Sequence, residues 1–434
     1  MELYSTRDHS LRVSLKHAVM TGLPADNGLY MPEYIHPLPA WFFDKLPDYS
    51  FPQLSFEICK HLFEGVVVED ELCEIINECI SFDAPLFKLD EHTSILELFH
   101  GPSLAFKDFG ARFMAGLMGH FAKQDDEQLV ILVATSGDTG GAVAAGFLET
   151  PNTQVVILYP SGKVSHLQEK QLTTLGQNIS ALEVAGTFDD CQQLVKQAFL
   201  DRELTDKIRL TSANSINIAR LIPQSLYYFR AYQKLADKSL PVVFSIPSGN
   251  FGNLTAGLFA QRLGLPIAQF IAATNVNDVV PQYLQHGKFS PRPSIQTISN
   301  AMDVGNPSNF ARMLDLFEGD WGDMCRLIQG FAFNDGETRI AMKEVYEQFG
   351  YVLDPHSAVG FLALREFQKE HPQTHGIVLE TAHPTKFLDV VEPAISQKVE
   401  IPKRLAILAN KPKVAVNMEV DYATFKAFLQ KNYG

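Results

Sequence analysis

The feature that most restricts the fold of this 434-residue chain is a series of short apolar runs that begins near residue 128. Helix-like segments separate the runs, for example residues 187–201, where Thr187 and Asp190 have the spacing of a capping box. Strands that are apolar throughout are buried on both faces, which is typical of a largely parallel sheet covered by helices. We therefore predict an α/β fold with ligands at the carboxyl ends of its strands. The predicted strands are 128–135, 153–160, 179–186, 208–214, 241–247, 269–275 and 376–384.

The first 90 residues lack this alternation. Proline and turn residues dominate positions 22–39, and helical patterning follows from Leu54 to Ile80. We predict an N-terminal helical lobe of residues 1–90, with residues 91–434 forming the rest, because a chain of this length suits two or three lobes. The last residues, 403–434, read as a loop followed by a helix and carry no motif.

Composition excludes several kinds of partner. The net charge of −14 argues against nucleic acid or anionic lipid, which both favour a basic surface, so an anionic substrate would need a local basic pocket. No apolar run is long enough to span a bilayer, and the N-terminus lacks the apolar core of a signal peptide. We expect a cytoplasmic protein without membrane contact, and the sequence leaves open whether it is a monomer or a homodimer.

The cysteines and histidines do not indicate a metal site. The five cysteines form no CxxC pair, so we expect reduced thiols and no structural zinc. His371 and His375 have helical ligand spacing, but Pro372 interrupts it and no HExxH pattern is present. We therefore expect no metal in catalysis.

Two loops that follow predicted strands are suited to bind anions. The segment PSGNFGN, residues 247–253, precedes a helix pattern, so backbone N–H groups at the helix start can hold a phosphate. It is neither a Walker loop nor a GxGxxG fingerprint. In residues 134–146, ATSGDTGGAVAAG, the N–H and hydroxyl donors of Ser136, Gly137, Thr139 and Gly140 suit a carboxylate or a phosphate. Each loop, taken alone, also fits an ordinary turn or helix cap.

A third segment, residues 99–113, places Lys107 among leucine and phenylalanine residues. Apolar surroundings lower the pKa of a lysine and make the neutral amine available for imine formation. The alternative is a lysine that extends to solvent or pairs with Asp108.

Six segments together resemble a known family: FHGPSLAFKDFG, TSGDTGGAVA, SANSINIARLIPQ, PSGNFGN, AMDVGNPSNF and LETAHPTKF. Their order and spacing are similar to the threonine synthases, which are pyridoxal-phosphate enzymes of fold type II, the tryptophan synthase beta-like group. The resemblance covers about nine tenths of the chain, and long composite motifs seldom match by chance. It implies two α/β lobes with largely parallel sheets beside the N-terminal lobe. It also implies conversion of O-phospho-L-homoserine and water to L-threonine and phosphate by γ-elimination and β-addition of water, the last step of threonine biosynthesis.

The resemblance also implies roles for individual residues. Lys107 would bind pyridoxal 5'-phosphate as a Schiff base and then move the substrate's α-proton. Thr381 would place a hydroxyl near the pyridine nitrogen. The cofactor phosphate would bind to Ser248, Gly249, Asn250, Phe251, Gly252 and Asn253. The substrate carboxylate would bind to Ser136, Gly137, Asp138 and Thr139. Asp138 stands where many fold type II enzymes have Asn, so it contacts the cofactor or only shapes the loop.

Expulsion of phosphate requires local cations, which a net-acidic chain must gather in one place. The candidates in the matching segments are Arg220, Lys163 and Lys386, with Asn217, Ser103 and His100 as neutral donors. We interpret His356 and His383 as structural. Competing interpretations are a serine or threonine dehydratase, a phospholyase, a catalytically silent relative and a nicotinamide-dependent dehydrogenase, the last of which does not fit the glycine pattern.

Overall fold

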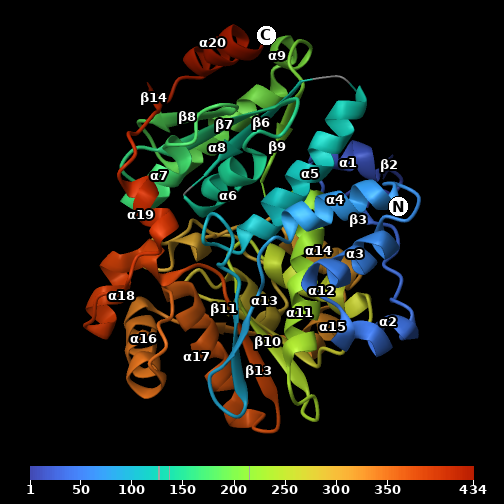
Figure 1. Cartoon of the computed structure of the whole chain (residues 1–434), viewed down its shortest axis with the longest axis vertical. Helices are drawn as coiled ribbons and strands as arrows, with labels where there is room; N and C mark the ends of the chain where they lie inside the picture. The colour runs from blue at the N-terminus through green and yellow to red at the C-terminus, as the bar shows by residue number, and fades with distance from the viewer. Residues whose placement is uncertain (126–127, 136, 215) are drawn as a thin grey trace.

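The computed structural model describes residues 1–125, 128–135, 137–214 and 216–434, with the side chains of residues 124 and 125 excepted. Within these ranges the chain forms three sheets (Figure 1). Two of them are largely parallel and lie in separate lobes, one above the other in the view of Figure 1. The predicted α/β class with largely parallel sheets is therefore confirmed.

The small lobe is built on a five-stranded, all-parallel sheet of order β14-β8-β7-β6-β9. Four of its strands coincide with predicted apolar runs. The fifth, β14, comes from the C-terminal tail, where we predicted only a loop and a helix. Its strands are β6 (Leu129–Ala134), β7 (Thr153–Pro160), β8 (Ile179–Val184), β9 (Leu210–Ser212) and β14 (Val416–Met418). Its helices are α6 (Asp138–Phe147), α7 (His166–Thr173), α8 (Phe188–Leu200), α9 (Arg202–Thr205) and α20 (Tyr422–Tyr433).

The large lobe is built on a six-stranded sheet of order β12-β11-β10-β13-β5-β4, in which only the short edge strand β4 is antiparallel. Its strands are β4 (Leu86–Lys88), β5 (Thr93–Glu97), β10 (Val242–Pro247), β11 (Gln269–Thr274), β12 (Ile328–Ala332) and β13 (His375–Glu380). The helices that cover it include α11 (Leu226–Lys234), α12 (Gly252–Arg262), α13 (Val279–His286), α14 (Phe310–Leu316), α15 (Trp321–Leu327), α16 (Asp335–Phe349), α17 (Pro355–Glu370) and α18 (Leu388–Ile395).

The N-terminal segment packs beside both lobes, at the right of Figure 1. The predicted helical stretch from Leu54 to Ile80 is two helices, because the chain turns at residues 63–68. The segment also forms a small antiparallel sheet that its sequence pattern did not indicate, since each strand is only three or four residues long. Its elements are β1 (Glu2–Ser5), β2 (Arg12–Ser14), α1 (Leu15–Thr21), β3 (Tyr30–Pro32), α2 (Ala40–Lys45), η1 (Leu46–Asp48), α3 (Phe51–Leu62) and α4 (Glu69–Cys79). The boundary at residue 90 stays a prediction.

The chain crosses between the lobes at segments that carry predicted site residues. After β5 it passes through residues 98–106 into α5 (Lys107–Asp125), which packs against α4, α6 and α10 (Ile218–Leu221). It returns through α10 and η2 (Ile222–Ser225) and later through η4 (Pro384–Phe387) and α19 (Lys403–Ala409).

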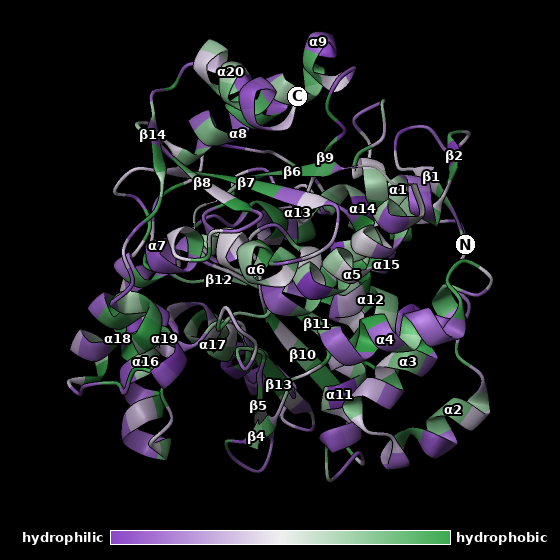
Figure 2. Cartoon of the chain, turned by 45° about the horizontal axis from the view of Figure 1, so that its top comes forward, coloured by the Kyte–Doolittle hydropathy of each residue, from purple (hydrophilic) through white to green (hydrophobic). Residues whose placement is uncertain are grey.

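Hydrophobic residues gather on the strands and on the inner helices, whereas hydrophobic and hydrophilic residues alternate along the peripheral helices (Figure 2). Among the described residues, no helix is both long and apolar enough to span a bilayer.

Candidate active site

Lys107 is held where the two lobes meet, as the first residue of α5. The loop before it is bonded to the chain that leaves β13. The amide of Phe106 donates to the carbonyl of Thr381 (2.9 Å), and the amide of His383 donates to the carbonyl of Leu104 (3.0 Å). Leu104 has a φ of 61°, a costly conformation for a leucine that persists only where the surrounding structure imposes it. Lys107 and Thr381 are therefore fixed relative to each other by backbone hydrogen bonds.

The surroundings of Lys107 lower the pKa of its amine. The residue is partly buried, and burial lowers its pKa to about 8; the charge of Asp138 opposes this shift, whereas the charges of Arg220 and Lys386 add to it. Its Nζ lies 5.8 Å from the centre of the Phe106 ring, and no hydrogen bond or ion pair engages it within the described part of the chain. The neutral, nucleophilic form is thus accessible near neutral pH.

The predicted phosphate loop, residues 248–253, follows β10 and opens α12. In the large sheet β13 lies between β10 and β5, so this loop, Thr381 and the Lys107 loop leave the carboxyl ends of three neighbouring strands. Phe251 has a φ of 57° at the start of the helix. A Cβ on Gly249 would lie 2.7 Å from the carbonyl oxygen of Ala301, so only glycine fits there. The loop is therefore a closely packed helix start of the kind that binds anions.

Asn253 supports the assignment of this loop to a ligand. Its Oδ1 accepts hydrogen bonds from the hydroxyls of Tyr227 and Tyr228, each at 2.8 Å. Its Nδ2 is buried and has no partner among the residues that the structure describes. A buried donor without an acceptor fits a site whose acceptor is a bound phosphate.

Asn250 is engaged from behind the loop. Its Oδ1 accepts from the amide of Ser308 (2.6 Å), and its carbonyl accepts from Nδ2 of Asn309 (3.1 Å). Asn309 in turn accepts from Nη1 of the fully buried Arg312 (2.7 Å). The sequence pattern predicts no role for Asn309, because a supporting contact leaves no pattern in the sequence. Ser248 is buried and donates from its hydroxyl to the carbonyl of Ile246 (2.9 Å).

The second anion loop is shaped by Thr135, whose Oγ1 accepts from the amides of Gly137 (3.0 Å) and Gly140 (2.8 Å). Gly137 has a φ of 138°, and a Cβ there would lie 2.6 Å from the side chain of Gln168. Thr139 is partly buried in the first turn of α6. Ser136 lies outside the described residues.

Asp138 and Lys386 form a buried ion pair between the lobes, with Nζ 2.6 Å from Oδ1. Gln168 also donates to Asp138 (2.9 Å), and Lys386 also donates to the carbonyl of Ser103 (2.8 Å). Burial alone would raise the pKa of Asp138, but the charges of Lys386 and Lys107 hold it well below its ordinary value. Asp138 therefore holds Lys386, which is one of the residues predicted to bind the substrate phosphate. The position of Asp138 in the sequence did not indicate this pairing.

Arg220 is the second buried cation. Its Nη1 donates to the carbonyl of Ala213 (2.6 Å), its Nε has no partner among the described residues, and burial lowers its pKa to about 10. A Cβ on Gly110 would lie 2.7 Å from the carbonyl oxygen of Arg220, so α10 packs tightly on the helix that begins with Lys107. Asn217 caps α10 by accepting from the amide of Ala219 (3.0 Å) and thereby positions Arg220.

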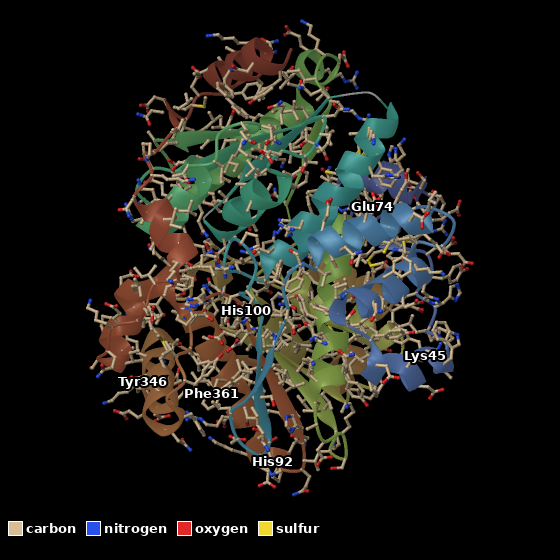
Figure 3. All side chains as sticks on the ribbon, in the orientation of Figure 1. Lys45, Glu74, His92, His100, Tyr346 and Phe361 are labelled. Carbon is tan, nitrogen blue, oxygen red and sulfur yellow. The ribbon has the colours of Figure 1, made fainter. Side chains whose placement is uncertain are left out.

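The remaining candidates divide between the site and the surface. Ser103 is buried, and its Oγ has no partner among the described residues. Its amide donates to Asp108 (2.8 Å), and burial raises the pKa of Asp108 to about 6. His100 bonds to Glu97 (2.7 Å) and lies between the lobes in Figure 3. Lys163 is exposed on the loop after β7 and forms no ion pair with a described residue.

The predicted structural histidines are engaged in local bonds. The ring of His356 lies 2.6 Å from Asp354 and accepts from the amide of Ala301 (3.2 Å). His383 accepts from the amide of Thr385 (3.2 Å). Among the described residues, no cluster of histidine, cysteine and acidic side chains could hold a metal ion.

The fold and the site together define a pyridoxal-phosphate enzyme of fold type II. Its marks are a lysine with a lowered pKa, two lobes built on largely parallel sheets, and a glycine-rich helix start with a buried amide donor that lacks a partner among the described residues. A family model described as "Pyridoxal-phosphate dependent enzyme" matches residues 85–379. Models described as "Threonine synthase N terminus" and "Threonine synthase, C-terminal" match residues 2–80 and 357–429. The chain belongs to the threonine synthase family of pyridoxal-phosphate-dependent lyases.

Individual threonine synthases are similar to this chain over almost its whole length. The threonine synthase of Escherichia coli (strain K12) is 43% identical over 433 residues, covering 100% of both chains, and that of Haemophilus influenzae is 44% identical with the same coverage. The crystal structure of the Escherichia coli enzyme has a TM-score of 0.92 at 44% identity, over 99% of this chain and 100% of that one. A PLP-bound threonine synthase from Brucella melitensis has a TM-score of 0.94 at 33% identity, over 100% and 99%.

Proposed function

We propose that this chain converts O-phospho-L-homoserine and water to L-threonine and phosphate, the last step of threonine biosynthesis. The observation that carries the proposal is the gathering of Lys107, Arg220 and Lys386 at one buried site of a chain whose net charge is −14. A substrate with both a carboxylate and a phosphate explains why these cations occur together with the second anion loop, at the start of α6.

The cofactor supplies an electron sink for the carbanions formed on the substrate. We propose that Lys107 holds it covalently and that Thr381 lies at its ring nitrogen. The amides of Gly249 to Asn253, with Ser248 and the unpartnered Nδ2 of Asn253, bind its phosphate. Thr381 follows the end of β13, Ser248 to Asn253 follow the end of β10, and Lys107 begins α5 after the loop that leaves β5.

We propose that Lys107, once the substrate's amine has displaced it, takes the proton from the substrate's α-carbon and returns protons in later steps. Its lowered pKa, about 8, suits a group that accepts and donates protons near neutral pH. The hydroxyls of Ser136 and Thr139 bind the substrate carboxylate. Gly137 shapes the loop around it, because its amide donates to Oγ1 of Thr135 (3.0 Å).

We propose that Arg220 and Lys386 bind the leaving phosphate. The unpartnered Nε of Arg220 and Oγ of Ser103 are donors available to it in the described structure. Asp138 then acts as the partner of Lys386, holding the cation in place. Asn217 positions Arg220 through its helix cap, and the exposed Lys163, on the loop after β7, attracts the anionic substrate from solvent.

The test is product analysis with the purified holoenzyme and O-phosphohomoserine. Threonine and inorganic phosphate should appear in equal amounts. Accumulation of 2-oxobutanoate with phosphate, without threonine, would replace the proposal with a phospholyase. Release of pyruvate from serine or of 2-oxobutanoate from threonine, without turnover of O-phosphohomoserine, would indicate a dehydratase.

A further inference from the structure

Two glutamates end the adjacent strands that carry the site. Glu97 of β5 and Glu380 of β13 are partners in the register of this parallel pair, the last residue of each strand. Glu380 is 0% exposed, and its Oε1 has no hydrogen-bond partner among the described residues. Two like charges side by side in a sheet repel each other, and burial makes the repulsion stronger. Protonation of one carboxyl group relieves this repulsion.

The hydroxyl of Tyr351 contacts both carboxyl groups and lies between them. It lies 2.9 Å from Oε1 of Glu97 and also contacts Oε2 of Glu380. A tyrosine hydroxyl has one hydrogen, so it can donate to only one of the two. Burial, and then the two carboxylates, raise the pKa of Tyr351 far above its ordinary value, so the hydrogen stays on the phenol. The other contact needs a hydrogen from a carboxyl group.

The surroundings decide which glutamate carries that hydrogen. Burial alone would raise the pKa of Glu97, but hydrogen bonds from His100 and Tyr351 hold it below its ordinary value. Burial raises the pKa of Glu380 well above its ordinary value, and the charges of Asp354 and Glu97 raise it further. Glu97 is thus the anion and Glu380 the acid.

We propose that Glu380 is an uncharged carboxylic acid in the working enzyme, donating to Tyr351, which donates to Glu97. This hydrogen-bond chain is a positioning unit for the site. The carbonyl of Glu380 accepts from the amide of Leu98 (2.9 Å), at the start of the loop that leads to Lys107, and Thr381 follows Glu380 directly. The inference goes beyond the proposed function, because it requires no particular substrate.

The groups around Glu380 determine how its contribution to the stability of the protein changes with pH. Glu380 faces Asp354, Glu97 and Tyr351, and Glu97 also faces His100 and His383. An unfolded chain releases the Glu380 proton near the ordinary carboxyl pKa, whereas the folded chain keeps it to higher pH. The contribution of Glu380 to stability is therefore complete below its ordinary pKa and is lost as pH rises toward its folded pKa.

Infrared spectroscopy of the holoenzyme in heavy water tests the protonation directly. At pH about 8, where ionisation of Asp108 removes its contribution, the wild type should show the C=O band of one buried carboxylic acid. Glu380→Gln should remove the band, and the matched variant Glu97→Gln should keep it. A wild type without the band, or a band that Glu97→Gln removes and Glu380→Gln keeps, would overturn the proposal.

The positioning role has a separate readout in the visible circular dichroism of the bound cofactor. Glu380→Gln replaces the acid with an uncharged donor of the same shape, so the signal and kcat should stay near those of the wild type. Tyr351→Phe removes the bridge and should reduce the signal. An unchanged signal in Tyr351→Phe, or an equal loss in both variants, contradicts the positioning unit.

Discussion

Lys386, on the segment after β13, reaches across the site to Asp138 at the start of α6, so one buried ion pair ties the large lobe to the small lobe. The two residues are far apart in the chain, and both are almost inaccessible to solvent. Because Lys386 is also our candidate for the substrate phosphate, the same cation contributes to folding and to binding.

We predict that Lys386→Met lowers the free energy of unfolding by about 3–5 kcal/mol, since it leaves Asp138 as a buried charge without its partner. Urea unfolding of the holoenzyme measures this loss. The double variant Asp138→Asn/Lys386→Met should regain part of it, because the uncompensated charge is gone. Purely additive losses would mean that the pair is not coupled.

We predict that Lys107→Ala abolishes the visible band of the bound cofactor and lowers kcat by at least about 10²–10⁴-fold, the range expected for removal of a proton-transfer group. Absorbance spectra and threonine formation measure both effects. The matched control is Lys163→Ala, which changes an exposed lysine and should keep the band. Retention of the band in Lys107→Ala would assign the cofactor to another residue.

We predict that cofactor capture by the apoenzyme depends on pH through Lys107. Only the neutral amine attacks an aldehyde, so the capture rate should rise as pH increases through about 8 and then level off. Stopped-flow absorbance at fixed pyridoxal phosphate gives the midpoint. Because the charge of Asp138 raises this pKa, Asp138→Asn should move the midpoint down; an upward shift would contradict the assigned environment.

We predict that Gly249→Ala destabilises the apoenzyme by about 1–3 kcal/mol, the usual effect of overpacking, and weakens cofactor binding. The new Cβ would lie 2.7 Å from the carbonyl oxygen of Ala301 and 2.8 Å from Cα of Met302, so the loop must shift. Gly252→Ala is the control in the apoenzyme, since its Cβ would meet nothing closer than Nδ2 of Asn309 at 3.4 Å. Equal destabilisation by both would refute the packing argument.

The strands that sequence could predict are those with long apolar runs. Residues 153–160 match β7 at both ends, and β10 and β11 match to within a residue of the prediction. The strands β4, β5, β12 and β14 were missed because runs of three to five residues show no clear period. The pairing of β4 with β5 and of β14 with β8 depends on tertiary contacts that no local window contains.

The site was predictable where the chemistry lies in one segment and not where it joins distant ones. The apolar surroundings of Lys107 and the helix start at residues 248–253 could be predicted from the sequence, whereas the roles of these residues rest on the family resemblance and stay predictions. The partners of Asp138, Asn250 and Glu380 could not, since each bond joins segments that meet only after the sheets have formed. The sequence nominated Asn217 as a ligand of the substrate, whereas in the structure its side chain caps α10.

The small lobe is inserted between β5 and β10, and its last strand, β14, returns from the C-terminal tail. Both junctions of the insertion run through the site, one at Lys107 and the other at Arg220. A chimera that exchanged residues 98–226 with a homologue would thus bring in the foreign segments that carry Lys107 and Arg220, and the native β14 would have to pair with a foreign β8. We expect such a chimera to be more stable when the donor segments include the tail as well.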